Sequence, residues 1–169
     1  IVELLGGAYI ALDGTRGILN ALEILKTSDE GEGMCYVNHS AKMRTVYLLL
    51  NPNASVQEAN AFEDYLQEFY VEYGLIDPNK SLDEQAITGL AADKYPIFSD
   101  FVAYLEKRRA AIRAGSNKIE ADLAIREART CDNIYKAFRS LVTNYGAIFN
   151  GHTSIDNIMD RQIVFFNIT

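Results

Sequence analysis

The stretch CDNIYKAFRSLVTNYG, from Cys131 to Gly146, decides the fold class of this chain. Its apolar side chains recur every three or four positions, which is the spacing of one face of an α-helix. They are Cys131, Ile134, Tyr135, Phe138, Leu141, Val142 and Tyr145. We therefore predict a long helix from about Lys118 to Tyr145, and Gly146 suits the left-handed position that ends such a helix.

Similar patterns earlier in the chain predict four more helices. Their expected ranges are Val37–Leu50, Ser55–Tyr73, Ser81–Ala92 and Ser99–Gly115. Two of them open with the spacing of a capping box, Ser55 with Glu58 and Ser81 with Glu84. The residues expected to face inward are Val46, Leu49 and Leu50, then Val56, Ala59, Phe62, Leu66, Phe69 and Tyr73, and later Phe101, Val102, Leu105 and Ile112.

Short strands are expected at both ends, at Ala8–Leu12 and at Gln162–Ile168. The fold class is therefore mainly α: a bundle-like block of about five helices flanked by short β-strands. A lone strand needs partners, so this order suggests an insertion into a larger α/β sheet. We divide the chain into residues 1–25, the end of an α/β core; residues 26–148, the helical subdomain; and residues 149–169, a loop and strand returning to the core.

Bulk composition fits one soluble domain of 169 residues. The net charge of −7 argues against broad phosphate binding, and no direct nucleic-acid site is evident. No apolar run approaches the roughly 20 residues of a membrane-spanning helix. Cys35 and Cys131 are read as reduced, buried thiols, with a disulfide between them as the less favoured alternative. The chain has no initiator Met or leader, and both ends interrupt a pattern, so we expect a piece of a larger protein.

Catalytic, cofactor and metal motifs are not found in this sequence. It has no G-x-x-x-x-G-K-[ST] loop and no strand that ends in an acid as a Walker B element would. His39 and His152 are interpreted as isolated surface or capping residues, because no second ligand is spaced near either. The acidic run Asp29 to Glu32 and the basic run Glu106 to Arg113 are read as solvated.

The loop FNGHTSID, from Phe149 to Asp156, is the stretch whose residue types most suggest a specific role. Asn150 and Gly151 suit a tight turn with positive φ angles. One interpretation is a turn that returns the chain from helix to sheet. Another is an interface or structural loop formed by Phe149, Asn150, Gly151, Thr153 and Asp156. A third is an enzyme of unrecognised type built around His152 and Asp156.

Four stretches together resemble a known family, the VirB-four or TraE-like cytoplasmic ATPases of bacterial type IV secretion and conjugation. They are LLGGAYIALDGTRGILNALEIL (Leu4 to Leu25), YPIFSDFVAYLEK (Tyr95 to Lys107), FNGHTSID and QIVFFNIT (Gln162 to Thr169). The first is similar to a Gly-Gly strand followed by an Asn-Pro-Leu-Asp turn, with Ala21 in place of Pro and Glu23 in place of Asp. The others are similar to a Pro-Thr-Phe-Ser-Asp-Leu helix start, a Phe-Asn-Gly-x-Thr-Asn-Val-Asp loop and the strand after it.

The resemblance implies the helical subdomain inserted in a RecA-like motor, between Walker A and Walker B. The chain itself would hold no cofactor, whereas ATP and Mg would bind elsewhere in the parent. Expected partners are neighbouring ATPase subunits and secretion-channel proteins, with a possible homo-oligomer. The expected location is the cytoplasm, at the inner face of the membrane. The alternative is a free-standing helical interaction or regulatory domain, whose two end strands would pair with each other.

Overall fold

The computed structural model describes residues 8–11, 17–27, 29–115, 121–154 and 164–167. This part of the chain contains four α-helices: α1 (Glu32–Leu50), α2 (Val56–Tyr73), α3 (Phe98–Gly115) and α4 (Ala121–Phe149). Two single 3₁₀ turns, η2 (Leu82–Glu84) and η3 (Ala92–Lys94), lie between α2 and α3. The prediction of a mainly helical chain is confirmed.

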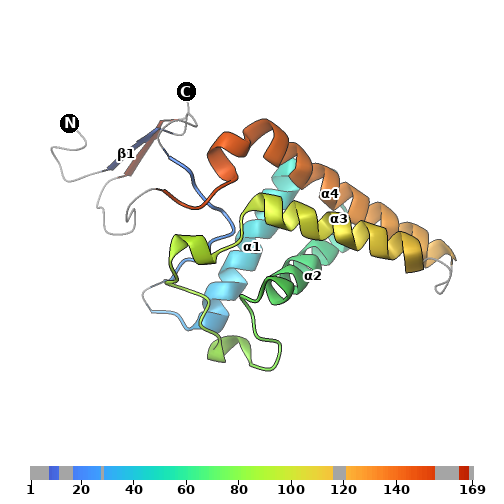
Figure 1. The fold of residues 1–169 in the computed structure, drawn as a ribbon, viewed down its shortest axis with the longest axis horizontal. Coiled ribbons are helices and arrows are strands. Elements are labelled where there is room, and N and C mark those ends of the chain that lie inside the picture. Colours follow the sequence, from blue (N-terminus) through green and yellow to red (C-terminus); the bar gives the residue numbers. More distant parts are fainter. Residues whose placement is uncertain (1–7, 12–16, 28, 116–120, 155–163, 168–169) are drawn as a thin grey trace.

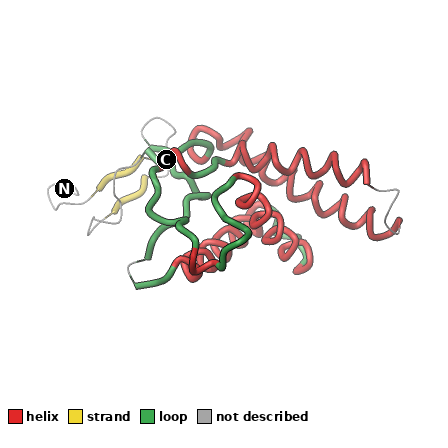
Figure 2. Tube along the Cα trace, turned by 60° about the horizontal axis from the view of Figure 1, so that its bottom comes forward, coloured by secondary structure: helices red, strands yellow, loops and turns green. Residues whose placement is uncertain are grey.

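The strands β1 (Ala8–Ala11) and β2 (Val164–Asn167) lie beside each other at one end of the molecule (Figures 1 and 2). They pair in parallel, with Ala8 opposite Val164 and Ala11 opposite Asn167. Parallel strands need a long crossover connection, and here the whole helical block supplies it. The strands are therefore not without partners, and their pairing is the arrangement that the free-standing alternative predicts.

Helix α2 begins and ends where its sequence signals predict. The Ser55 hydroxyl accepts a hydrogen bond from the backbone N–H of Glu58 at 3.1 Å, which satisfies one free donor of the first turn. At the other end Gly74 adopts a left-handed conformation with φ of 88°, which favours glycine. Helix α2 packs against α1 and α3. Its two caps therefore set the points at which the chain enters and leaves this helix.

The prediction of a helix over Ser81–Ala92, which would have been one of five, is wrong. The capping box is present, since the Ser81 backbone N–H and hydroxyl both donate to Glu84 Oε2, but only one 3₁₀ turn follows. The Gln85 amide turns back and donates to the carbonyls of Asp77, Lys80 and Ser81 at 2.9 to 3.3 Å. Those bonds hold a compact turn, and Gly89 then takes a positive φ of 67°.

One predicted helix end and the role of Gly146 need correction. Helix α1 begins at Glu32, earlier than the expected Val37. The long regular part of α4 ends at Tyr145, as predicted, and a further turn runs to Phe149; Gly146 does not adopt the left-handed conformation expected of it. The expected start of α4 at Lys118 lies outside the described residues. A non-helical backbone at Tyr145 (φ −128°, ψ 17°) bends α4 one turn before its end, and this bend leaves the Tyr145 ring exposed rather than inward.

The core is built from aromatic rings that α1, α2, α3 and α4 contribute together. Phe138 lies at its centre, with ring centroids 5.4 Å from Phe62, 5.0 Å from Phe101 and 5.6 Å from Phe98. Tyr47 stacks on Phe62 at 4.9 Å. Packed aromatic pairs of this kind contribute beyond their buried area, so the four helices form one unit.

The inward face of α1 differs from the prediction. Leu49 is 75% exposed, and Tyr47 and Met43 take the buried positions instead. Val56, at the start of α2, also points outward. Apolar residues lie on several sides of α1, among polar ones such as Asn38 and Lys42, so their positions do not identify which face is buried.

Helices α3 and α4 run side by side and project away from the strand pair as a long hairpin (Figures 1 and 2). Arg109 of α3 forms an ion pair with Asp132 of α4, and its guanidinium lies 4.0 Å from the centre of the Tyr135 ring. Arg108 lies 4.8 Å from the Tyr65 ring of α2. The basic run is therefore packed across the helices and is not simply solvated.

Candidate functional site

Two segments far apart in the sequence lie together between the strand pair and the helices. Residues 17–24 bring the chain in from β1, and residues 148–154 lead it out towards β2. The Leu19 N–H donates to the carbonyl of Ile148, and the Ser154 N–H donates to the carbonyl of Ile18, both at 3.1 Å. The Ile18 N–H donates to Ser154 Oγ at 3.0 Å. We call these two segments, together with residues 95–99, the junction.

Asn20 is the buried centre of the junction. Its backbone N–H donates to Thr153 Oγ1 at 3.1 Å, and its side-chain amide donates to the Pro96 carbonyl at 2.9 Å. Its Oδ1 accepts from the Leu22 N–H at 3.1 Å. One side chain thus links the incoming segment to the residues that begin α3, and a buried amide with all these partners holds a unique geometry.

Thr153 and Asn150 are the residues of the outgoing loop with the clearest roles. The Thr153 hydroxyl accepts from Asn20 and donates to Glu23 Oε2 at 2.6 Å. Asn150 Oδ1 accepts from the Ser99 N–H at 2.7 Å and so satisfies a free donor in the first turn of α3. Both side chains therefore hold the loop to other elements.

Gly151 has a different role from the one predicted. It does not adopt a positive φ. A Cβ atom built there would lie 3.0 Å from Ile18 Cδ1 and 3.1 Å from Ile18 Cγ2, so glycine allows the two segments to approach closely. Phe149 ends α4 and packs against the core, and His152 is exposed. Asp156 lies outside the described residues.

Tyrosines from the helical block hold the incoming segment from the other side. The Tyr70 hydroxyl of α2 donates to the Leu22 carbonyl at 3.0 Å, and the Tyr95 hydroxyl donates to the Ile87 carbonyl at 2.9 Å and lies 3.3 Å from the Ile24 carbonyl. Burial raises the pKa of Tyr70 well above its ordinary value. This hydroxyl therefore stays protonated and keeps donating at any physiological pH.

His39 of α1 completes this contact and is not the surface residue that the sequence suggested. It is 4% exposed, and its Nε2 lies 2.7 Å from the Tyr70 oxygen. Because Tyr70 gives its proton to Leu22, His39 Nε2 donates, and Nδ1 is left without a hydrogen-bond partner. Burial, with the nearby Lys42 charge, holds the pKa of His39 well below its ordinary value. Its spacing of four from Cys35 and Met43, both buried, is the sequence signal that was missed.

Glu32 forms a second tether and corrects the prediction of a solvated acidic run. Its carboxylate accepts from the N–H groups of Ile87 and Thr88 at 2.9 and 3.0 Å, and from Thr88 Oγ1 at 2.6 Å. Burial raises the pKa of Glu32, but the hydrogen bonds from Thr88 and Ile87 together lower it by more than burial raises it. The pKa of this carboxyl therefore lies below its ordinary value. The tether fixes the connection between α2 and α3 against the start of α1.

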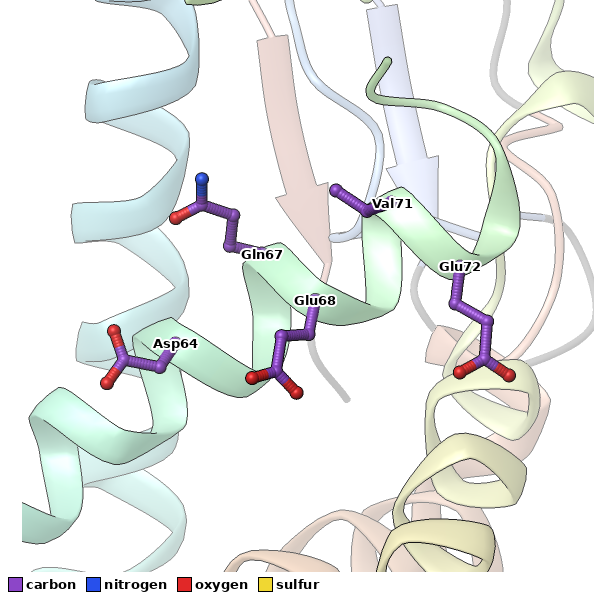
Figure 3. A pocket seen from close by; sticks show the side chains of 5 residues that line it. All are labelled: Asp64, Gln67, Glu68, Val71 and Glu72. Atoms are coloured by element: carbon purple, nitrogen blue, oxygen red, sulfur yellow. The ribbon is translucent and has the colours of Figure 1, made fainter. Parts of the chain in front are cut away.

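The outer face of α2 carries a shallow groove lined by Asp64, Gln67, Glu68, Val71 and Glu72 (Figure 3). Two of its acids are already paired with α3: Glu68 with Arg108, and Glu72 with Lys107. Pairs this exposed contribute little stability, and they neutralise much of the charge of the groove. The groove therefore lacks the converging polar groups of a ligand pocket.

Chemical reactivity is not evident in the described part of the chain. No group of three or more His, Cys, Asp or Glu side chains there could hold a metal ion. Cys35 and Cys131 are buried free thiols, and burial raises the pKa of Cys131 to about 11, far from a reactive thiolate. None of the described helices is both long and apolar enough to cross a bilayer. What the structure shows at the junction is a set of hydrogen bonds that hold its segments together.

Comparisons with known proteins agree with this architecture. No protein-family model matches the chain. An uncharacterized protein of Bacillus anthracis, pXO2-09, is 29% identical over an alignment of 180 positions, which covers 99% of this chain and 27% of that protein. The solved structure of VirB4 of Thermoanaerobacter pseudethanolicus has a similar fold, with a TM-score of 0.67 and 20% identity, over 98% of this chain and 38% of that one. The chain therefore spans about a quarter to two fifths of the length of these relatives.

Proposed function

We propose that this chain is the helical subdomain of a VirB4-like type IV secretion ATPase. The observation that carries the proposal is the likeness of fold to VirB4, which extends over 98% of this chain but only 38% of the VirB4 chain. The four-part resemblance in the sequence points the same way. Walker A would then lie before residue 1 and Walker B after residue 169, and ATP and Mg would bind in the parent motor.

The junction supports a mechanical role for such a subdomain. Its bonds run from the two segments next to the strands directly to the helices: Leu22 to α2, Asn20 to the start of α3, and Asn150 to the first turn of α3. A shift of the strands would move these helices as a body, because buried hydrogen-bonded contacts deform little. The subdomain would thereby carry nucleotide-driven motion from the motor to neighbouring subunits or secretion-channel proteins at the inner membrane face.

The strand pair bears on the alternative, a free-standing interaction domain. Pairing of β1 with β2 is what that alternative predicts. However, an isolated pair of strands is marginally stable, and parallel sheets are normally covered on both faces. A parallel pair of four residues each is better explained as part of a larger sheet, so the inserted subdomain remains the proposal.

ATP hydrolysis by the longer protein, read from the same reading frame, tests the proposal. We expect a P-loop upstream of residue 1 and hydrolysis that a change of the P-loop lysine abolishes. Asn20→Ala in that protein should leave basal hydrolysis within about twofold and reduce conjugative transfer at least tenfold, because it loosens the junction without touching nucleotide. Asn38→Ala, on the exposed side of α1, is the matched control.

Two results would defeat the proposal. A reading frame with no P-loop would remove the motor and leave the free-standing domain. A parent that hydrolyses ATP but transfers equally well with Asn20→Ala and with Asn38→Ala would show that the junction does not carry the motion.

A further inference from the structure

A groove beside α4 is lined by positive charges, although the chain as a whole carries a net charge of −7. Its cations are Arg109 of α3 and Lys136 and Arg139 of α4, and the side chains around them are polar. Among the described residues no acidic side chain lines it, and the sequence has no Asp or Glu from Asn133 to Ser154. We call this hollow the α4 groove.

Tyr135, which also lines the α4 groove, holds two of these cations in place. Its side chain is buried, with the Arg109 guanidinium 4.0 Å and the Arg139 guanidinium 5.8 Å from the ring centre. Arg139 Nη1 also donates to the Tyr135 hydroxyl at 3.1 Å. These cation–π contacts and this hydrogen bond restrict both arginines before a ligand arrives. Binding there therefore costs less side-chain entropy than at freely rotating surface cations.

The positive charge of the α4 groove is only partly compensated. Asp132 pairs with Arg109 and with Lys136, the second at 2.6 Å. Arg139 forms no ion pair with any described residue, so most of its N–H donors have no partner within the chain. One carboxylate thus serves a groove that holds three cations, and the groove keeps an excess of positive charge.

The next turn of α4 adds uncharged donors to the same groove. Asn144 Nδ2 donates to Ser140 Oγ at 3.0 Å, which leaves the proton of the Ser140 hydroxyl available to another acceptor. Thr143 is exposed beside them. Guanidinium, ammonium and hydroxyl donors gathered in one place suit carboxylate oxygens, which only accept hydrogen bonds.

We propose that the α4 groove binds an acidic segment of a partner protein, with Arg139 as the principal contact. A guanidinium matches a carboxylate through two parallel hydrogen bonds, and Arg139 is the cation of the groove that has no acid of its own. A long nucleic acid suits the groove less well, because such a polyanion also meets the negative field of the remaining chain. A short acidic segment meets the groove alone.

The inference deepens the proposed function and rests on it only for the identity of the partner, which would be a neighbouring subunit or a secretion-channel protein. Its test reads peptide binding by the 169-residue chain and involves no ATP hydrolysis. The two ideas can therefore fail separately.

Fluorescence anisotropy of a labelled oligo-glutamate peptide of about ten residues, about 15 Å long as a helix, is the first measurement. We expect binding that weakens as salt is added, because exposed charges are screened. Arg139→Gln should weaken it about fivefold, the upper end for an exposed ion pair. Lys94→Gln is the matched control, because it removes the same charge from the exposed Lys94 of η3. Circular dichroism checks that both variants keep the helical content of the parent chain.

A negative charge placed in the groove gives a second reading. Thr143→Glu should weaken binding of the same peptide by about tenfold or more, because it sets a carboxylate beside Arg139 and repels the ligand. Thr45→Glu makes the same change at an exposed threonine of α1 and should have little effect.

Three results would overturn the proposal. The first is no binding of oligo-glutamate even at low salt. The second is an equal loss for Arg139→Gln and Lys94→Gln, which would show that only net charge matters. The third is tighter binding of a single-stranded oligonucleotide of the same length that Arg139→Gln weakens equally, which would assign the groove to nucleic acid.

Discussion

Replacing Glu32 with alanine should free the connection between α2 and α3 from the start of α1. The carboxylate accepts three hydrogen bonds from Ile87 and Thr88, at 2.6 to 3.0 Å. Hydrogen bonds to a charged group each contribute about 1.5 to 3 kcal/mol. Water reaches part of this loop in the variant and replaces some of the loss. We therefore expect the free energy of unfolding to fall by about 2 to 3 kcal/mol, the upper part of the range for single substitutions.

Thermal and urea denaturation, followed by circular dichroism, measure the effect. For a domain of this size, 1 kcal/mol corresponds to roughly 2 to 4 °C in Tm, so Tm should fall by about 4 to 12 °C. Glu30→Ala is the matched control: Glu30 lies two residues away and accepts one exposed bond from Asn38 Nδ2. It should change stability by less than about 0.5 kcal/mol.

The same variant gives a pH test with a definite sign. The pKa of Glu32 is lowered in the folded chain, so its contribution is present above the ordinary pKa of glutamate and is lost as pH falls through the lowered value. The stability difference between the parent chain and Glu32→Ala should therefore shrink in acid. Equal losses for Glu32→Ala and Glu30→Ala, or a difference that grows in acid, would refute the tether.

Three further predictions concern the junction and its support. Thr153→Val removes a hydroxyl that binds the buried Asn20 and the half-buried Glu23 and should cost about 1 to 2 kcal/mol in urea unfolding; no change would show that the hydroxyl bonds are not needed. Gly151→Ala crowds Ile18 and should cost about 1 to 2 kcal/mol, and a double-mutant cycle with Ile18→Ala should recover part of that loss. Because burial depresses the pKa of His39, stability should fall as pH drops below the ordinary value of 6.5; His39→Gln should flatten that slope, and an unchanged slope would assign it to other groups.

The helices with local signals were predictable from the sequence, and α2 is the clearest example. Ser55 and Gly74 act through neighbours one turn away, so the residues that set each end are adjacent in the sequence. Helix α1 lacks such signals. Its N-terminal Gly31 makes no side-chain cap, and its apolar residues are not confined to one face. Both the start of α1 and its buried face therefore depend on packing.

The prediction of a helix from Ser81 to Ala92 was wrong for a related reason. The capping box correctly marked the start of a turn, but the competing bonds of Gln85 and the tether to Glu32 decided how far the turn extended. Glu32 lies 55 positions from Ile87, and no local rule connects residues so far apart. The loop was thus predicted to be a helix because its tertiary partners cannot be identified from the local sequence.

The outgoing loop was identified from turn chemistry alone, but its partners were not. Thr153 meets Asn20 across 133 positions, and Asn20 reaches Pro96 across 76. Neither Asn20 nor Glu23 carried a sequence signal of its own, beyond lying in a stretch that resembles a family turn. Gly151 was singled out for backbone freedom, whereas the structure shows a close approach to Ile18 there. Whether this loop serves as an interface remains a prediction.

The long sequence separation across the junction sets the order in which the chain folds. The bonds between its incoming and outgoing segments join residues 129 to 136 positions apart, whereas α3 and α4 form a hairpin of neighbours. Closing so large a loop costs entropy that only the finished contacts offset, so contacts of this kind form late. The helices should therefore assemble first, and the junction should close after the folding transition state. Substitutions of Asn20 or Thr153 would then accelerate unfolding and leave the refolding rate nearly unchanged.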